Sequence, residues 1–303
     1  VATTYVVISW AAWHVGNRVG EAKNPGPGLD GECSLLGSAN VTSLVANFDL
    51  VKNLPVQVCA LQETRLNEWA QSEMRRKFAA EGWQLLCGKA QPRQRRQNGS
   101  GTEWNARHGG VAVAVRDGMV ATRGPVDTDV RRRLWDTGRW VHGAVAVADG
   151  RQILHVMSVY GYTGASANNE AKQRNERLLQ DVLEAGAELG NVPIAIVGDF
   201  NTNPQDSPTL RTAFATGAWS DVAAEVAFGT GRPLQNTCFK SEAGTRIDAV
   251  VGNACLTRLV RDFGVLADTG LPTHLPLTVA LDVVGLARQI PKIVRPAAFA
   301  PRG

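Results

Sequence analysis

The chain has 303 residues, of which 44% are hydrophobic and 20% are charged, and its formal net charge at pH 7 is +4. This length and balance fit one large globular domain or two small ones, and they exclude a chain that stays disordered for lack of apolar residues. The mild positive charge permits a polyanionic partner without requiring one. No apolar run approaches the roughly 20 residues of a membrane span, so we expect no membrane partner.

Cysteine usage favours a reducing compartment. The five cysteines are an odd number and form no C-x-x-C pair, and three of them (Cys59, Cys87 and Cys255) lie among apolar neighbours. We therefore expect reduced, mostly buried thiols in an intracellular protein, and no zinc site.

The two ends of the chain differ in composition from its middle. Residues 20–31 are rich in Gly and Pro, which predicts a linker, so residues 1–32 form an appendage ahead of a folded domain at residues 33–286. Residues 287–303 show little periodicity and predict a C-terminal tail or a further linker.

One motif in the first linker has a second interpretation. Asn24-Pro25-Gly26-Pro27 matches the end of viral-type ribosome-skipping peptides. Those peptides carry an Asp-x-Glu-x segment before the Asn, whereas Glu21 here stands one position too early. A Pro/Gly linker is the favoured interpretation.

Short apolar and β-branched runs recur along the middle of the chain and predict β-strands. In chain order these runs are residues 56–61, 111–115, 141–148, 152–160, 194–197, 247–251 and 277–283. The third and fourth runs predict a hairpin that turns at Asp149-Gly150. Amphipathic patterns predict helices over residues 68–80 and 170–189. Many strands with few long helices predict an α/β protein in which sheets pack face to face.

Residues 88–109 form a polar insertion between two predicted strands. Arg93, Arg95 and Arg96 cluster in it without helical or strand periodicity, which predicts a mobile basic loop. A second basic patch begins at Arg131 and continues to Arg133. Each patch is either a solvated surface or a contact surface for the phosphates of a nucleic acid.

The most informative stretch is residues 194–201, which read Ile-Ala-Ile-Val-Gly-Asp-Phe-Asn. The β-branched run predicts a buried strand, and Asp199 and Asn201 follow it two positions apart, so both can project to the same side. A carboxylate and an amide at a rigid strand end can position a water molecule or a metal-bound oxygen. An Asx turn that closes the strand is the alternative for this stretch taken alone.

Polar residues also stand at the ends of other predicted strands. In chain order these positions are Asn40, Gln62-Glu63-Thr64, Tyr160, Asp199 with Asn201, Arg246-Ile247-Asp248 and His274. Each has an ordinary structural alternative, such as a solvated carboxylate for Glu63 or a surface ion pair between Asp248 and Arg246. Taken together, they predict one shared site built from strand ends on a rigid scaffold.

In this order and spacing, the motifs resemble those of the endonuclease/exonuclease/phosphatase superfamily, whose members hydrolyse phosphodiesters or phosphomonoesters with Mg²⁺. Within it, the chain most resembles the apurinic-type endonuclease domains of non-LTR retrotransposons, to which Arg246-Ile247-Asp248 and the preceding Thr237 point. The resemblance implies a four-layer α/β/β/α sandwich of two packed mixed β-sheets flanked by helices. It also implies Mg²⁺, or Mn²⁺ in its place, bound by Glu63 with help from Asn40.

The resemblance assigns roles to the other residues of the site. Asp199 would orient or deprotonate the attacking water. Asn201 and Tyr160 would hold the phosphate. His274 would stabilise the charge that grows on phosphorus, and Asp248 would fix its ring and protonation state.

One departure from the family pattern concerns the residue before His274. The family has a Ser-Asp-His triplet, whereas this chain has Pro272-Thr273-His274. Thr273 is neutral, and Asp268 can supply the missing carboxylate only if the loop folds back. Reduced activity, or a strict one-metal mechanism, follows as a hypothesis.

DNA is the expected partner, with its phosphates contacted by Arg93, Arg95, Arg96 and Arg131. The resemblance implies an endonuclease that nicks one strand of target DNA and leaves a 3′-hydroxyl to prime reverse transcription. It also implies a polypeptide that continues into a reverse transcriptase and acts in the nucleus. The alternatives are an abasic-site repair endonuclease, a small-molecule phosphatase or phosphodiesterase of the same superfamily, and a catalytically weakened nucleic-acid-binding relic.

Overall fold

The computed structural model describes residues 33–283, apart from residues 99–100, 107–108, 148–149, 151 and 166–167. The predicted appendage with its Asn24-Pro25-Gly26-Pro27 motif, the predicted C-terminal tail and Asp149 of the predicted turn therefore lie outside the described residues. Most of the described chain forms two six-stranded sheets, and a separate two-stranded ribbon accompanies them.

The first sheet has the strand order β13-β14-β1-β2-β6-β3. Its strands are β1 (Cys33–Asn40), β2 (Val58–Gln62), β3 (Trp83–Cys87), β6 (Val111–Arg116), β13 (Val260–Val265) and β14 (Leu277–Asp282). The pairing is mixed, because β1 runs parallel to β2 while β1 and β14 are antiparallel.

The second sheet has the strand order β11-β12-β10-β9-β8-β7. Its strands are β7 (Ala121–Arg123), β8 (Trp140–Val147), β9 (Gln152–Tyr160), β10 (Ile194–Asp199), β11 (Trp219–Asp221) and β12 (Asp248–Asn253). β9 and β10 are parallel, whereas β8 and β9 form the antiparallel hairpin that the sequence predicts.

Seven helices lie in the described part of the chain. They are α1 (Phe48–Lys52), α2 (Glu68–Ala80), α3 (Asp129–Thr137), α4 (Asn169–Ala187), α5 (Pro208–Ala215), α6 (Val222–Thr230) and α7 (Ala254–Thr257). The predicted helices over residues 68–80 and 170–189 correspond to α2 and α4. No helix within the described ranges is long and apolar enough to cross a membrane.

Side-chain alternation explains why the sheets stack into layers. In β6, Val113 and Val115 enter the cluster between the two sheets, whereas Ala112 and Ala114 enter the cluster that also holds Phe78 of α2. Successive side chains of a strand point to opposite faces, so the valines meet the other sheet and the small alanines leave room for a helix.

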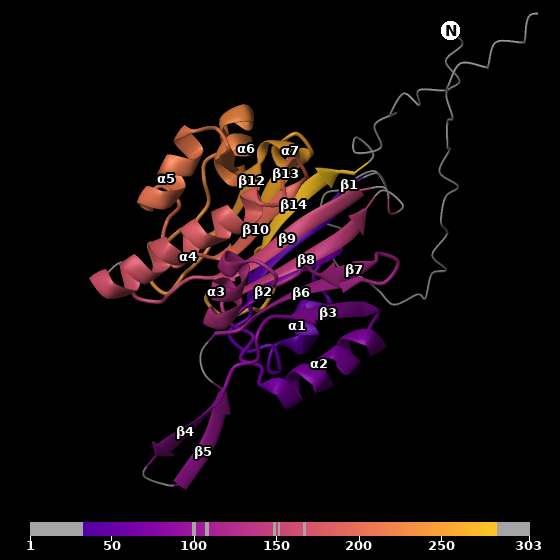
Figure 1. Ribbon diagram of the computed structural model, residues 1–303, viewed down its shortest axis with the longest axis vertical. Helices are drawn as coiled ribbons and strands as arrows, with labels where there is room; N and C mark the ends of the chain where they lie inside the picture. Colours follow the sequence, from indigo (N-terminus) through magenta and orange to yellow (C-terminus); the bar gives the residue numbers. More distant parts are fainter. Residues whose placement is uncertain are drawn as a thin grey trace, which may run out of the picture.

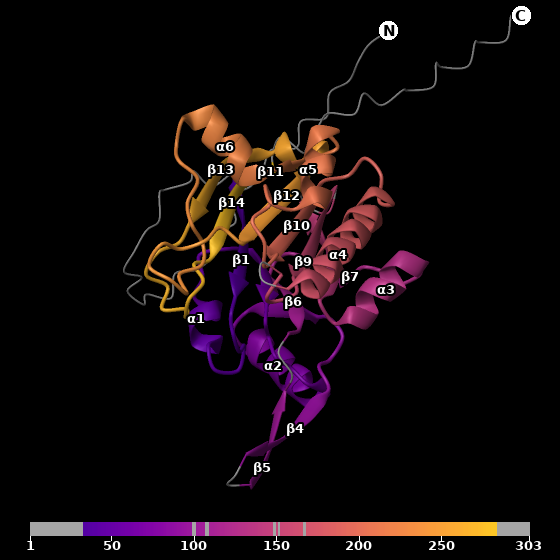
Figure 2. The same ribbon diagram turned by 90° about the vertical axis from the view of Figure 1, so that its left-hand side faces the viewer.

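Three buried clusters correspond to the three interfaces of a four-layer sandwich. One fills the space between the sheets, one joins the first sheet to α1 and α2, and one joins the second sheet to α3, α4 and α5. Figure 2 shows α3, α4 and α5 gathered apart from α1 and α2. The predicted α/β/β/α sandwich of two packed mixed sheets is confirmed.

The polar insertion does not form the irregular loop that the sequence predicts. β4 (Arg93–Asn98) and β5 (Gly101–Ala106) pair as an antiparallel ribbon, with Arg95 opposite Trp104. This ribbon projects away from the sandwich (Figure 1). A projecting ribbon needs no apolar face against a core, so the alternating hydrophobicity that identifies a half-buried strand is missing from its sequence.

Candidate active site

The register of the second sheet brings three of the predicted residues side by side. Tyr160, at the end of β9, lies opposite Asp199, at the end of the parallel strand β10. Asp199 in turn lies opposite Asp248, the first residue of the antiparallel strand β12. One edge of this sheet therefore carries a phenol and two carboxylates in adjacent positions.

The first sheet contributes its own strand ends to the same place. Asn40 of β1 lies opposite Gln62 of β2, and the Asn40 Nδ2 donates to Asp199 Oδ2 across the sandwich at 2.8 Å. Gln62 Nε2 also crosses the interface and donates to Ser158 Oγ at 3.1 Å. At this edge, buried hydrogen bonds replace the apolar contacts that join the sheets elsewhere.

Asp199 is the carboxylate that residues from both sheets surround. Its side chain is buried, and its Oδ1 accepts the backbone N–H of Asn201 at 2.9 Å. Burial, followed by the negative charge of Asp248, raises the pKa of Asp199 to about 7, although His274 and two hydrogen bonds oppose the shift. A carboxyl group whose pKa lies near neutrality can accept a proton from water and release it again.

A chain of three side chains orients His274. Thr237 Oγ1 donates to Asp248 Oδ2 at 2.8 Å, and Asp248 Oδ2 lies 2.9 Å from His274 Nδ1. Nε2 of the same ring lies 3.9 Å from Asp199 Oδ2. Burial lowers the pKa of His274, but the hydrogen bond and charge of Asp248 and the charge of Asp199 outweigh it, so the pKa is raised overall. The ring is therefore fixed in place and favours its cationic form.

Tyr160 and Arg139 form the wall next to Asp199. Burial, followed by the charges of Glu63 and Asp199, raises the pKa of the Tyr160 phenol, so the hydroxyl stays protonated. The Arg139 guanidinium stacks 4.9 Å from the Tyr160 ring and 4.2 Å from the Tyr162 ring, and it donates to the Gly161 carbonyl at 2.6 Å. Arg139 thus adds a positive charge to this wall.

The predicted metal ligands, Glu63 and Asn40, offer the hard oxygen donors that Mg²⁺ prefers. The Glu63 side chain is 13% exposed, and its Oε1 pairs with Arg65 Nη2. The charges of Glu63 and of Asp199 both raise the pKa of Tyr160, so both carboxylates lie near the same phenol. A guanidinium against Glu63 shows that this position attracts a cation. The donor set therefore fits Mg²⁺.

Backbone strain concentrates at the same edge. Glu63, Asn201 and Thr273 have φ values of 54°, 51° and 63°, in the left-handed region that non-glycine residues rarely adopt. Each such residue costs on the order of 1–3 kcal/mol and is kept only where the surrounding structure enforces it. Strained residues of this kind cluster at functional sites, which is a structural signal independent of residue type.

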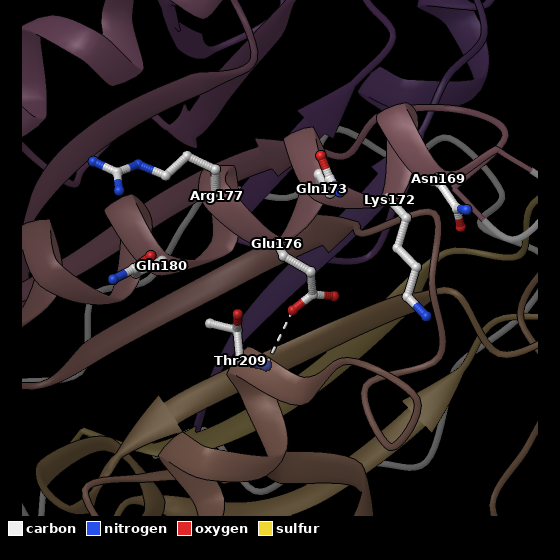
Figure 3. A pocket seen from close by; sticks show the side chains of 7 residues that line it. All are labelled: Asn169, Lys172, Gln173, Glu176, Arg177, Gln180 and Thr209. Carbon is white, nitrogen blue, oxygen red and sulfur yellow. Dashed lines mark hydrogen bonds between the residues drawn. The ribbon is translucent and has the colours of Figure 1, made fainter.

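A polar hollow of about 680 Å³ adjoins the site. Asn201 and Ile247 border it on the side of Asp199. Its charged lining includes Lys172 and Lys240 as well as Glu176 and Asp206. A second hollow lies along α4 beside the start of α5, and Glu176 is among the residues that line it (Figure 3). The Glu176 Oε2 accepts the backbone N–H of Thr209, in the first turn of α5, at 3.0 Å. That carboxylate serves as a cap for α5, so we assign no binding role to the second hollow.

Several expectations need correction. Arg131 is not available to a ligand, because its side chain is 7% exposed and pairs with Asp127 and Glu188. Arg246 does not form a surface pair with Asp248, because it forms a buried ion pair with Asp221 at 2.5 Å.

Two further predictions concern the basic ribbon and the loop before His274. Arg93, Arg95 and Arg96 lie on β4, in the projecting ribbon rather than beside Asp199. Asp268 is exposed and is not part of the one group of potential metal ligands found among the described residues, which consists of Asp199, Asp248 and His274.

Comparison with protein-family models matches residues 29–270 to the Endonuclease/Exonuclease/phosphatase family. The chain belongs to this family. Its enzymes are hydrolytic nucleases and phosphatases that depend on a divalent metal ion. No curated protein sequence matches the chain.

Three solved structures illustrate the shared fold. The catalytic domain of APE2 from Xenopus laevis is 18% identical with a TM-score of 0.60, and the match covers 82% of this chain and 91% of that one. The 3′ phosphatase NExo from Neisseria, bound to a product DNA hairpin, is 18% identical with a TM-score of 0.57, covering 82% and 99%. The endonuclease domain of TRAS1, a telomere-specific non-LTR retrotransposon, is 13% identical with a TM-score of 0.53, covering 83% and 99%.

Proposed function

We propose that this chain is a Mg²⁺-dependent endonuclease of a non-LTR retrotransposon that nicks one strand of DNA. The observation that carries the proposal is the buried group of Asp199, Asp248 and His274, whose ligand atoms lie within 4.8 Å of one another at the edge where both sheets end. A proton acceptor and a cationic imidazole side by side suit the in-line attack of water on a phosphodiester.

Asp199 acts as the proton acceptor. Its Oδ1 is held by the Asn201 amide and its Oδ2 by Asn40, so the carboxylate cannot rotate away from an incoming water. With a pKa of about 7, it takes a proton from that water as the oxygen bonds to phosphorus.

His274 stabilises the negative charge that develops on the phosphate during the attack. The Asp248 hydrogen bond fixes Nδ1, so that Nε2 presents its proton to the phosphate oxygen on which negative charge grows. Tyr160, which stays protonated, and Asn201 donate further hydrogen bonds to the phosphate.

Glu63 and Asn40 would hold the Mg²⁺ ion, and Mn²⁺ can take its place. When bound, the ion neutralises charge on the phosphate and on the leaving oxygen. Thr273 leaves the position directly before His274 without a carboxylate, and the Asp268 side chain is exposed, which supports a single metal position.

Duplex DNA is the proposed substrate, and two surfaces support it. The β4–β5 ribbon carries Arg93, Arg95 and Arg96 and projects from the sandwich, and Lys172 and Lys240 line the hollow next to Asn201. The likeness to the TRAS1 endonuclease domain supports a role in target-primed reverse transcription, in the nucleus and within a polypeptide that continues into a reverse transcriptase. The likeness to APE2 favours a second candidate, an abasic-site repair endonuclease.

Supercoiled plasmid with Mg²⁺ tests the proposal. We expect conversion to the nicked circle, abolished by EDTA, and extension of the nick by a DNA polymerase without prior end repair, which requires a 3′-hydroxyl. Faster cleavage of an abasic oligonucleotide than of intact DNA would favour the repair enzyme. Release of phosphate from an inositol phosphate, without nicking, would place the chain among the small-molecule phosphatases. Binding of DNA without cleavage would indicate a catalytically weakened relic.

A further inference from the structure

Arg65 is the cationic side chain that lies against the predicted metal ligand Glu63. Its Nη2 pairs with Glu63 Oε1, and the side chains of Arg65 and Glu63 are 30% and 13% exposed. A guanidinium keeps its charge at every pH at which the protein is folded. The chain itself therefore neutralises the carboxylate that a metal ion would need.

Most of the hydrogen-bonding capacity of this guanidinium is unused. Arg65 Nε is buried, and it has no hydrogen-bond partner among the residues that the structure describes. Within the same residues, Nη2 is the one guanidinium nitrogen that donates, although the group carries five N–H donors in a planar fork. Carboxylates and phosphates match this fork best when they accept two parallel hydrogen bonds. Arg65 therefore has donors left for a second anionic ligand.

The backbone that carries Arg65 is fixed, so its side chain is the part that can move. Glu63 and Arg65 have left-handed φ values of 54° and 55°, which persist only where the surrounding structure enforces them. Between them, the Thr64 N–H donates to the Gly110 carbonyl at 3.1 Å, and the Arg65 N–H donates to the Gly109 carbonyl at 2.9 Å. A change of partner at Arg65 therefore requires rotation about side-chain bonds and leaves the backbone in place.

The Tyr160 phenol, for which we propose a phosphate contact, lies close to Arg65. Gly109, which accepts the Arg65 N–H, packs against the Tyr160 ring, since a Cβ on Gly109 would lie 3.9 Å from Tyr160 Cδ1. Burial, followed by the charges of two carboxylates, raises the pKa of Tyr160, and the charge of Arg65 is among those that oppose this rise. The guanidinium and the phenol therefore border the same space.

We propose that Arg65 changes partner during the reaction: it neutralises Glu63 before Mg²⁺ binds there, and afterwards it holds a phosphate oxygen of the DNA. A metal ion and a guanidinium that share one carboxylate repel each other, so the Glu63–Arg65 pair weakens when the ion is present. The guanidinium then pairs with the phosphate, whose oxygens also match its fork. This inference rests on the proposed function, because it takes Glu63 as the metal ligand and DNA as the substrate.

A change of partner at Arg65 has a signature that a merely structural ion pair lacks. If Arg65 only stabilises Glu63, removing the guanidinium matters most while the carboxylate is charged. If Arg65 moves to the phosphate, removing it matters most once the charge of Glu63 is gone, because the guanidinium is then released. Glu63→Gln therefore imitates, without any metal, the effect that Mg²⁺ has on Arg65.

Affinity for a DNA duplex in EDTA tests this signature without metal and without cleavage. Fluorescence anisotropy compares the wild type, Glu63→Gln, Arg65→Gln and the double variant in one cycle. Arg65→Gln should weaken binding at least about fivefold more in the Glu63→Gln background than beside an intact Glu63. Arg65→Lys in that background should retain most of the affinity, because an ammonium also binds phosphate. An equal or smaller loss in the Glu63→Gln background would overturn the change of partner.

Mn²⁺ titration without DNA, followed by the electron paramagnetic resonance signal of free Mn²⁺, tests the neutralising role. Arg65→Gln should bind Mn²⁺ at least about fivefold more tightly than the wild type, because no guanidinium competes for Glu63. Arg65→Met, a second neutral variant, should match it. The matched control is Arg232→Gln, which ends an exposed pair with Asp262 and should keep the wild-type affinity. Wild-type affinity in both Arg65 variants would contradict the neutralising role.

The two measurements also separate this inference from the proposed function. If no protein binds the duplex, the proposed function fails, whereas the Mn²⁺ titration still decides whether Arg65 occupies the cation position at Glu63. If the wild type binds and nicks DNA but Arg65→Gln acts equally in both backgrounds, the nuclease assignment stands and the change of partner fails.

Discussion

His274 and His142 are both buried, yet their surroundings shift their pKa values in opposite directions. His274 meets Asp248 at 2.9 Å, and its pKa is raised. His142, on β8, meets another imidazole, with its Nε2 2.8 Å from His155 Nδ1, and burial followed by the charges of His155 and Arg131 lowers its pKa to about 3. Burial alone leaves a histidine neutral, and an adjacent carboxylate converts it into a cationic group suited to phosphate chemistry.

The packing around the His142 ring also differs from that around the His274 ring. A Cβ at Gly124 would lie 1.9 Å from His142 Nδ1, so that ring fills the space that a glycine leaves open. His274 instead lies at the edge where strand ends of both sheets meet. The comparison therefore separates a structural pair of histidines from the single histidine for which we propose a catalytic role, and the following substitutions test this distinction.

The largest difference should come from replacing each histidine by glutamine. His274→Gln should slow nicking about 10²–10⁴-fold, because it removes the charged donor. His142→Gln should keep the nicking rate and lower the melting temperature instead. Single-turnover nicking and thermal unfolding of both variants supply the measurement, and an equal loss of activity in the two variants would erase the distinction.

Removing the carboxylate should make His274 resemble His142. Asp248→Asn keeps the size of the side chain but takes away the charge that raises the pKa of His274. We expect about 10²-fold slower nicking and little loss of DNA binding. Asp262→Asn, at an exposed pair with Arg232, is the matched control. A rate in Asp248→Asn equal to that of the control would show that the negative charge of Asp248 does not matter for nicking.

Acid should destabilise the folded protein through His142. The folded-state pKa of His142 is lowered to about 3, below its ordinary 6.5, so the unfolded chain binds the proton more readily and stability falls as pH decreases from about 6.5 toward 3. At pH 4.5 this one group should cost about 2–3 kcal/mol in the free energy of unfolding relative to pH 8. Urea titrations should show a smaller pH dependence in His142→Gln than in the wild type, and parallel curves would refute the assignment.

The smallest effects should come from Thr273, next to His274. A β-branched residue at a φ of 63° is strained, so Thr273→Gly should raise the free energy of unfolding by about 1 kcal/mol.

Thr273→Asp should raise the Mg²⁺-dependent nicking rate if the missing carboxylate limits this enzyme. An unchanged rate and metal dependence in Thr273→Asp would remove that hypothesis.

Much of the fold can be predicted from local patterns. The apolar run of β6 and the amphipathic pattern of α2 identify both elements, since β6 is buried on both faces and α2 packs one face against the first sheet. Strands β1, β3, β7, β11 and β13 are not among the predicted runs. β7 and β11 have three residues each, and β13 is a half-exposed edge strand, so the hydrophobic periods of these three are weak. The β4–β5 ribbon is missed because its sequence is polar and lacks the alternating hydrophobicity of a half-buried strand.

The candidate site likewise has a part that the sequence predicts and a part that it does not. Asp199, Tyr160 and Asp248 could be predicted to meet because they stand at strand ends, and the register of β9, β10 and β12 brings them together. The pairing of Arg131 with Glu188 could not, because the two residues are distant in sequence and meet only when α3 packs beside the end of α4.

The central claim is that strand ends from both sheets form one cation-dependent hydrolytic site around Asp199 and Glu63. The most direct measurement is the single-turnover rate of plasmid nicking as a function of Mg²⁺ concentration for the wild type, Asp199→Asn and Glu63→Gln. The account predicts at least about 10²-fold slower nicking in Asp199→Asn at any Mg²⁺ concentration, and a higher Mg²⁺ requirement in Glu63→Gln. Nicking at the wild-type rate and Mg²⁺ dependence by both variants would contradict it.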